Sequence, residues 1–382
     1  MSAIKSVIAA GFAIVMSSIA VIANEVTGAG ATLPYPIYIK WADVYKNRTG
    51  IAIGYDFAGS GGGIKYVRQG LVTFGASDMP LPQKALEKDG MVQVPTVIAG
   101  IVPVVNIAGV KPGELVLDGA TLANIFYGQI KSWDDPAIKK LNPSLKLPNK
   151  AIAVVHRSDG SGTTYNFMKF LLKASEVWKD DGSANLWAQW PVGIGAKGND
   201  SVAGNVHNTS NSIGYVGYAH ALAANLAYVK MVNRSGNIVS PSVETFSAAA
   251  SGADLRSKSD FEIDLTDQAD SNAWPITAVT YIMMHRRPRD PPAARDAIRF
   301  FVWALSDGEK YATQLGYVSL PKEVVTRVVD VLSTQVRDAD GRAAYIIGKI
   351  DSPSSAHVDE RSDLFGRIAR FFRSQAAIRD GN

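Results

Sequence analysis

The feature that most constrains the fold of this sequence is a recurring order of strand, glycine-rich loop and helix. Apolar residues alternate over 51–57 as they do in a strand, glycines and a serine fill 59–63, and apolar residues at helical spacing follow over 64–71. The same order returns over 151–173, where a predicted strand leads through a polar turn into a helix. This alternation predicts α/β layers in which the loops after the strands build a ligand site.

The chain is long enough for more than one such unit. Its 382 residues are 47% hydrophobic, which is more than a single core usually needs, so we expect two lobes. The polar stretches at 141–149 and 233–242 do not have the composition of flexible linkers, which predicts that strands join the lobes. The formal charge of +4 is too small to indicate a nucleic acid partner.

Export is indicated by the N-terminal residues and by cysteine usage. Lys5 precedes an uncharged apolar run over 6–23 that ends in small residues, which predicts a signal peptide over 1–23, cleavage after Ala23 and a periplasmic protein. An uncleaved membrane anchor is the alternative, because the run approaches the ~18 residues that a span needs. The absence of cysteine excludes disulfides, thiolate metal sites, a cysteine nucleophile and the lipid-bearing cysteine of a bacterial lipoprotein.

Three predicted helix starts combine hydroxyl groups with glycine or proline, at 32–34, 60–63 and 161–163. Helix N-termini carry unpaired N–H groups and partial positive charge, and glycine lets the backbone approach a ligand closely. Together the three segments predict a site for one tetrahedral oxyanion. Each segment alone is more typical of an ordinary helix cap or turn.

Charged residues sharpen this prediction. Arg157 precedes the third segment, where its guanidinium can give an oxyanion two parallel hydrogen bonds, and Asp159 can hold that guanidinium in place. Asp78 ends a predicted strand over 72–78, and a carboxylate in an anion site favours a ligand that carries a proton, as hydrogen phosphate does and sulfate does not. The alternatives are that Asp78 only caps the following turn and that Asp159 only forms one.

Catalytic signals are weak by comparison. The five histidines lack HExxH or another metal-binding spacing, and core or surface roles are expected for them. No nucleotide-binding glycine loop is present, and Ser161 does not lie in a Gly-x-Ser-x-Gly elbow. We therefore expect no catalytic residue, no metal and no cofactor.

Four motifs in one order carry a family resemblance: GAGATLP at 28–34, GSGG at 59–62, FGASD at 74–78 and RSDGSGT at 157–163. With them, the chain resembles the phosphate-binding components of bacterial phosphate-specific ABC importers over roughly residues 27–345. Leu33 stands where that family commonly has Phe, and Gly61 where it commonly has a second Ser. Neither departure removes a backbone donor.

The resemblance implies a type II periplasmic-binding-protein fold, with two α/β lobes joined by a hinge and the ligand in the cleft between them. Lobe I would comprise 24–103 and 279–345, lobe II 104–278, and a C-terminal extension 346–382. The implied ligand is inorganic phosphate, and the implied partners are the membrane permease subunits of an ABC importer. We expect a monomer.

The resemblance also implies a set of phosphate-binding residues: Thr32, Leu33, Ser60, Asp78, Arg157, Ser161, Gly162 and Thr163. Leu33 and Gly162 would contribute backbone N–H groups, the Ser and Thr residues hydroxyl or backbone donors, and Arg157 a charged donor. Asp78 would accept the proton of the ligand. Asp159 would support Arg157 without touching the ligand.

Two other functions remain open at this point. A secreted, phosphatase-like enzyme would use the same oxyanion donors but needs a nucleophile or a metal. An envelope interaction protein would retain the fold and attach through residues 364–378, where apolar side chains among arginines predict a basic amphipathic helix. The same segment could instead pack on the outside of the body.

Overall fold

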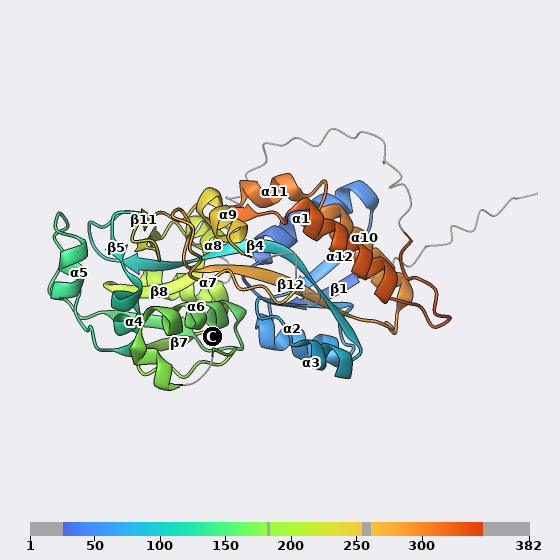
Figure 1. Ribbon diagram of the computed structural model, residues 1–382, viewed down its shortest axis with the longest axis horizontal. Coiled ribbons are helices and arrows are strands. Elements are labelled where there is room, and N and C mark those ends of the chain that lie inside the picture. Colours follow the sequence, from blue (N-terminus) through green and yellow to red (C-terminus); the bar gives the residue numbers. More distant parts are fainter. Residues whose placement is uncertain (1–25, 182–183, 254–260, 347–382) are drawn as a thin grey trace, which may run out of the picture.

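A computed structural model describes residues 26–181, 184–253 and 261–346 (Figure 1). The predicted signal peptide over 1–23 and the predicted amphipathic helix over 364–378 lie outside the described residues. No helix among those that are described is long and apolar enough to cross a membrane.

The described chain is a mixed α/β structure, as the alternation of elements predicted. The helices are α1 (Tyr35–Thr49), α2 (Gly59–Arg68), α3 (Gln83–Lys88), α4 (Gly119–Tyr127), α5 (Pro136–Leu141), α6 (Gly162–Ala174), α7 (Gly198–Asn208), α8 (Tyr218–Ala223), α9 (Val243–Ser251), α10 (Pro291–Ala304), α11 (Glu309–Gln314) and α12 (Lys322–Gln335), with a 3-10 helix at Glu176–Asp181. The strands are β1 (Val26–Gly30), β2 (Ile53–Asp56), β3 (Phe74–Ser77), β4 (Met91–Asn106), β5 (Val116–Leu117), β6 (Ala153–Arg157), β7 (Ile194–Ala196), β8 (Ser212–Gly217), β9 (Ala227–Tyr228), β10 (Lys230–Val232), β11 (Ile238–Val239), β12 (Thr277–His285) and β13 (Tyr317–Val318).

One sheet runs through the whole molecule in the order β2-β1-β3-β12-β4-β8-β6-β7. The pairs β1–β2, β1–β3, β6–β7 and β6–β8 are parallel, whereas β12 and β4 pair antiparallel with their neighbours. We call the part built around β1, β2 and β3 the β1 half, and the part built around β6, β7 and β8 the β6 half. In Figure 1 the two halves lie at opposite ends of the long axis.

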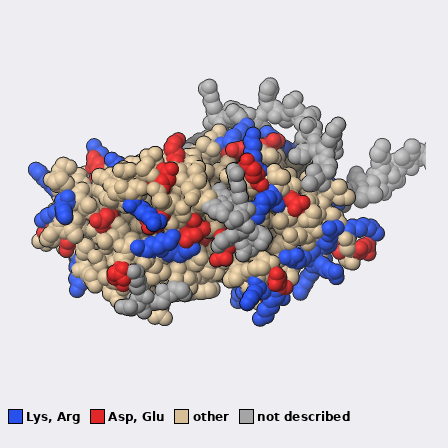
Figure 2. All heavy atoms as spheres, in the orientation of Figure 1, with Lys and Arg blue, Asp and Glu red and all other residues tan. Residues whose placement is uncertain are grey.

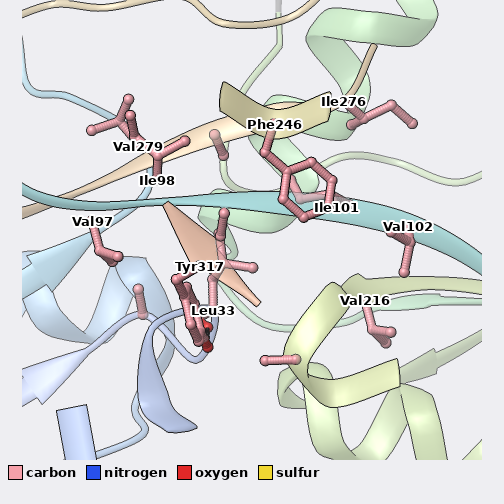
Figure 3. Packing of buried hydrophobic residues seen from close by; sticks show 14 of the residues in the cluster. Leu33, Val97, Ile98, Ile101, Val102, Val216, Phe246, Ile276, Val279 and Tyr317 are labelled. Atoms are coloured by element: carbon pink, nitrogen blue, oxygen red, sulfur yellow. Dashed lines mark hydrogen bonds between the residues drawn. The ribbon is translucent and has the colours of Figure 1, made fainter. Parts of the chain in front are cut away.

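The two halves are connected through β4 and through the start of β12. Up to Gly100, β4 pairs with β12, and from Ile101 onward it pairs with β8 in the β6 half. The returning chain passes the same place, because the Ile101 N–H donates to the Ile276 carbonyl at 2.8 Å. Figure 3 shows Phe246 next to Ile101 of β4 at this crossing. A Cβ atom on Gly100 would lie 2.1 Å from the Phe246 ring, so only glycine fits there.

A large apolar core follows this sheet, beside a smaller cluster that includes Ile64, Met91 and Met283, and buried tryptophans fix several helices and loops to the sheet. The indole N–H groups of Trp41, Trp133, Trp178 and Trp274, all fully buried, donate to the carbonyls of Gly308, Asn211, Ala123 and Ile101 respectively. Each tryptophan thus contributes apolar burial without leaving its N–H unsatisfied. The bond from Trp274 to Ile101 lies at the crossing of the two halves.

Sequence patterns predicted some boundaries well and one of them wrongly. Apolar residues at helical spacing over 34–49, followed by Gly50, predict a helix, and the structure has α1 there, ended by Gly50 at φ 75°. The loop expected over 59–63 is wrong, because these residues form the first turns of α2. Their glycines serve packing instead: a Cβ on Gly63 would lie 2.6 Å from the Cα of Gly30 and 2.5 Å from the Ala76 carbonyl oxygen.

Candidate functional site

The candidate site lies where the ends of β1, β3 and β6 meet the helices that follow them. Gly30, at the end of β1, has φ 146°, and a Cβ there would lie 2.1 Å from the Ala76 carbonyl oxygen. The Ala31 N–H donates to that same carbonyl at 2.9 Å. Only glycine therefore allows the chain to turn against β3 and to carry Thr32 and Leu33 toward the other half.

The second and third segments meet directly across the two halves. The Ser60 hydroxyl oxygen accepts hydrogen bonds from the Gly162 N–H at 3.0 Å and from the Asp78 N–H at 3.3 Å. A Cβ on Gly162 would lie 2.6 Å from both the Asp78 Cβ and the Ser60 oxygen, so glycine is required for this approach. The Asn166 amide also crosses the halves, donating to the Asp78 carbonyl at 2.8 Å.

Arg157 is the buried cation of the site. It ends β6, and its guanidinium makes two parallel bonds to Asp159, at 2.7 Å from Nε and 2.6 Å from Nη2. The Gly198 N–H holds Asp159 from the other side at 3.0 Å. Burial would raise the pKa of Asp159, but the hydrogen bonds and charge of Arg157 outweigh it and keep this pKa below its usual value. Asp159 therefore fixes the guanidinium, and is more than a turn-forming residue.

Each of the four hydroxyl groups of the site accepts at least one hydrogen bond through its oxygen. The Thr32 hydroxyl oxygen accepts from the Asn199 amide at 2.7 Å, and the Ser60 hydroxyl oxygen accepts from two backbone N–H groups. The Thr163 hydroxyl oxygen accepts from Arg157 at 3.3 Å. The Ser161 hydroxyl oxygen accepts from the Thr164 N–H at 3.0 Å. None of the four donates its proton within the described part of the chain. Since a hydroxyl group has one proton to give, each remains a donor for a bound anion.

Asp78 is the buried acceptor among these donors. Asp78 is 2% exposed, and its Oδ1 accepts a hydrogen bond from the Thr280 hydroxyl at 2.7 Å. Oδ2 is buried and accepts no hydrogen bond from any described residue. Burial raises the pKa of Asp78 to about 7, against the opposing effects of the Thr280 hydrogen bond and of the charges of Arg157 and His220. The turn after Asp78 is capped by Ser77 instead, whose hydroxyl oxygen accepts from the Met79 N–H.

All eight predicted binding residues and Asp159 come together here, although Ser161 has a structural task as well. Its hydroxyl caps α6, as the alternative for this residue anticipated. No histidine contacts that hydroxyl within the described chain, and no three acidic or histidine side chains among the described residues could share a metal ion.

Three further buried side chains of the site were not predicted. Thr280 supports Asp78 from β12, Asn199 reaches Thr32 from α7, and His220 reaches the Thr32 carbonyl from α8 at 2.9 Å. The local sequence pattern around Asn199 assigns no role to this residue. His220 was expected only to be a core or surface residue.

The glycine at position 61 has a local explanation. The Gly61 N–H donates to the Gly160 carbonyl at 2.9 Å, which is another contact between the halves. A Cβ on Gly61 would lie 2.7 Å from the Trp187 ring, and a Cβ on Gly160 would lie 2.5 Å from the same ring. Trp187 therefore occupies the space that a serine side chain at position 61 would need.

Comparison with known proteins places the chain in a family. The sequence pattern of the PBP superfamily domain matches residues 18–308. The phosphate-binding protein PstS of Haemophilus influenzae is 45% identical over 315 residues, covering 82% of this chain and 94% of the relative. That of Pasteurella multocida is 43% identical over 323 residues, covering 85% of this chain and 94% of the relative.

Solved structures agree on the fold. The crystal structure of a phosphate-binding protein from Stenotrophomonas maltophilia superposes with a TM-score of 0.62 at 18% identity, covering 85% of this chain and all of that one. The predicted α/β periplasmic-binding-protein fold is confirmed by this likeness. The family model and the relatives together identify the chain as a member of the PstS family of phosphate-binding proteins within the PBP superfamily.

Proposed function

We propose that this protein binds inorganic phosphate between its two halves and delivers it to an ABC-type phosphate importer. The ligand would receive hydrogen bonds from the hydroxyl groups of the site, from the backbone N–H groups of Leu33 and Gly162, and from Arg157. Asp78 would accept the proton of the ligand. The relatives support phosphate as the ligand, since each is a phosphate-binding protein PstS.

The observation that carries the proposal is the buried, unpartnered Oδ2 of Asp78 among hydroxyl groups that have protons to donate. An isolated buried acceptor is costly unless a donor reaches it. A protonated oxyanion satisfies both sides, because it accepts from the hydroxyl groups and donates its own proton to Asp78. Sulfate carries no such proton near neutral pH and would place two acceptors face to face.

The positive charge that attracts the ligand is local. On the face shown in Figure 2, acidic and basic side chains are interspersed over much of the surface, and Lys and Arg gather mainly at one end. The Arg157 side chain, by contrast, is 1% exposed and lies inside the site. A buried charge acts on an anion with little screening by salt. We therefore expect binding that depends weakly on ionic strength.

Isothermal titration tests the function. The purified protein, freed of bound anion, is expected to bind inorganic phosphate and to show no comparable heat with sulfate. Periplasmic binding proteins commonly bind by hinge closure, and lobes over 24–103 with 279–345 and over 104–278 would supply it here. The absence of heat with phosphate across pH 6 to 8 would end the proposal.

Gly162→Ala is expected to weaken phosphate binding by about tenfold to a hundredfold. The added methyl group would meet Asp78 and Ser60 across the halves, and overpacking of this kind costs about 1–3 kcal/mol. Because the clash arises between the halves, the thermal unfolding midpoint without phosphate should change little. Gly204→Ala is a matched control, since no atom lies within 4 Å of a Cβ there. Equal affinities of the two variants would contradict the closed arrangement.

The partners and location belong to the same proposal. The permease subunits of the importer would receive the ligand from a periplasmic, monomeric protein that has lost residues 1–23 and carries no lipid. The absence of cysteine supports the last point, because a bacterial lipoprotein carries its lipid on a cysteine. Intact mass of the exported protein would test both the cleavage and the lack of lipid.

A further inference from the structure

His220 makes a buried contact between the halves that the binding residues do not explain. Its side chain is 1% exposed. Nε2 lies 2.9 Å from the Thr32 carbonyl oxygen, and Nδ1 lies 2.6 Å from Oδ1 of Asp200. Thr32 belongs to the β1 half, whereas His220 on α8 and Asp200 on α7 belong to the β6 half. The imidazole thus bridges the two halves at a segment of the candidate site.

Both partners of the imidazole are acceptors, which fixes its protons. A carbonyl oxygen can only accept, so Nε2 must donate to Thr32. An ionised Asp200 can also only accept, so Nδ1 must donate as well. Neutral imidazole has one N–H group, and the His220–Asp200 pair must therefore hold one proton more than a neutral ring beside a carboxylate. This count is the same whether the extra proton lies on the ring or on Asp200.

The same segment of the β1 half is held at a second point. The Asn199 side chain donates to the Thr32 hydroxyl oxygen at 2.7 Å, and its backbone N–H reaches the same oxygen at 3.2 Å. The two bonds occupy the lone pairs of this hydroxyl and direct its proton away from Asn199. His220 and Asn199 together therefore set both the backbone position of Thr32 and the direction of its hydroxyl proton.

We propose that His220 and Asp200 form a proton-dependent clasp on the Thr32 carbonyl, so that closure of the protein on phosphate takes up a proton at this pair. This inference rests on the proposed function and concerns a positioning residue rather than a phosphate ligand. When the pair loses the extra proton, a nitrogen lone pair faces either Thr32 or Asp200. One hydrogen bond of the clasp then becomes a repulsive contact between two acceptors.

The groups around the clasp leave few competing sources of protons. The titratable side chains near it are Asp200 from α7, Asp78 from the end of β3, Tyr317 from β13 and Tyr35 from α1, while β4 has none. Burial raises the pKa of Tyr35 to about 12 and that of Tyr317 well above its usual value, so both stay neutral near pH 7. Asp78 and the phosphate ligand itself can also take up or release protons, and both are common to the variants compared below.

Calorimetric titration with inorganic phosphate in buffers of different ionisation enthalpy measures the protons taken up on binding. Imidazole in water is largely neutral at pH 8 and largely charged at pH 5.5, so the extra proton of the clasp has to come from solution at the higher pH. At pH 8, wild type should therefore take up more protons on binding phosphate than His220→Gln does, with a difference of up to about one proton. At pH 5.5 the two proteins should take up the same number. By linkage, this excess weakens wild-type binding as pH rises, by up to about tenfold per pH unit.

The Asp200→Asn variant is expected to keep the hydrogen bonds of the clasp while removing its need for an extra proton. An asparagine amide can donate to Nδ1, so the clasp is satisfied by a neutral ring that donates only to Thr32. The ratio of the phosphate affinity of Asp200→Asn to that of wild type should then rise by about tenfold from pH 5.5 to pH 8. The variant should also lack the excess proton uptake of wild type. His207→Gln is the matched control, because His207 is exposed on α7, and it should retain the wild-type profile.

The outcomes decide between the proposals. If wild type, His220→Gln and Asp200→Asn take up the same number of protons at each pH, the clasp is refuted while phosphate binding stands. If wild type gives no heat with phosphate, the proposed function itself fails. His220→Gln variants that do not fold leave Asp200→Asn, whose affinity ratio must rise with pH for the clasp to hold.

Discussion

Replacing Arg157 with methionine is expected to weaken phosphate binding by about a thousandfold. The guanidinium is the buried cation of the site, and hydrogen bonds from charged groups contribute about 1.5–3 kcal/mol each. Two of its N–H groups are occupied by Asp159, and others remain to reach a ligand. The loss of two such bonds corresponds to two to four factors of ten in affinity. Calorimetric titration with phosphate measures it.

The same substitution should also destabilise the protein, which the experiment must separate from the loss of binding. Arg157→Met leaves Asp159 buried without its cation, and breaking a buried pair in this way costs about 3–5 kcal/mol. Replacing both residues, as Arg157→Met with Asp159→Leu, removes the uncompensated charge. This double variant is expected to recover most of the unfolding free energy in urea while remaining unable to bind phosphate. Recovery of binding would show that Arg157 is not a phosphate ligand.

The sequence predicted those parts of the site that local chemistry determines. Arg157 and Gly162 lie within one short motif at a strand-to-helix transition, and Asp78 ends a strand. The carboxyl ends of strands gather at one place in an α/β fold, so these residues could be expected to meet. Gly50 likewise predicted the end of α1, because its left-handed conformation is a common helix terminus.

The rest depended on contacts that local patterns do not record. Asn199 and His220 reach Thr32 over 167 and 188 residues of sequence, and Thr280 reaches Asp78 over 202. Glycines at 59–63 suggested a loop because glycine is a poor helix former, yet they begin α2. Close packing of α2 against Gly30 and Ala76 outweighs helix propensity at Gly63, and only the assembled sheet reveals that packing.

Asp78→Asn is expected to reduce the preference for phosphate over sulfate by at least about a hundredfold. A site built to accept the proton of its ligand can reject an analogue without that proton by a factor on the order of 10⁴. Asparagine keeps the shape, but with its oxygen bonded to Thr280 its amide would present a donor where the unpartnered Oδ2 of Asp78 can accept from the ligand. Sulfate would gain a hydrogen bond and phosphate would lose one. Competition titrations of both anions at pH 7 measure the ratio, and an unchanged ratio would remove Asp78 from the acceptor role.

The same variant should be more stable than wild type at alkaline pH when no anion is bound. Burial raises the pKa of Asp78 from 3.8 to about 7, so between these values the folded protein binds more protons than the unfolded chain. Stability from this group is therefore fully present below pH 3.8 and is lost as pH rises through 7. A pKa difference of about three units corresponds to at most about 4 kcal/mol of unfolding free energy. Asp78→Asn cannot ionise, so its gain in unfolding free energy should appear at pH 8 and vanish near pH 4. A ligand that brings a proton to Asp78 would relieve this destabilisation, which is how the proposed site would couple phosphate binding to the stability of the closed protein.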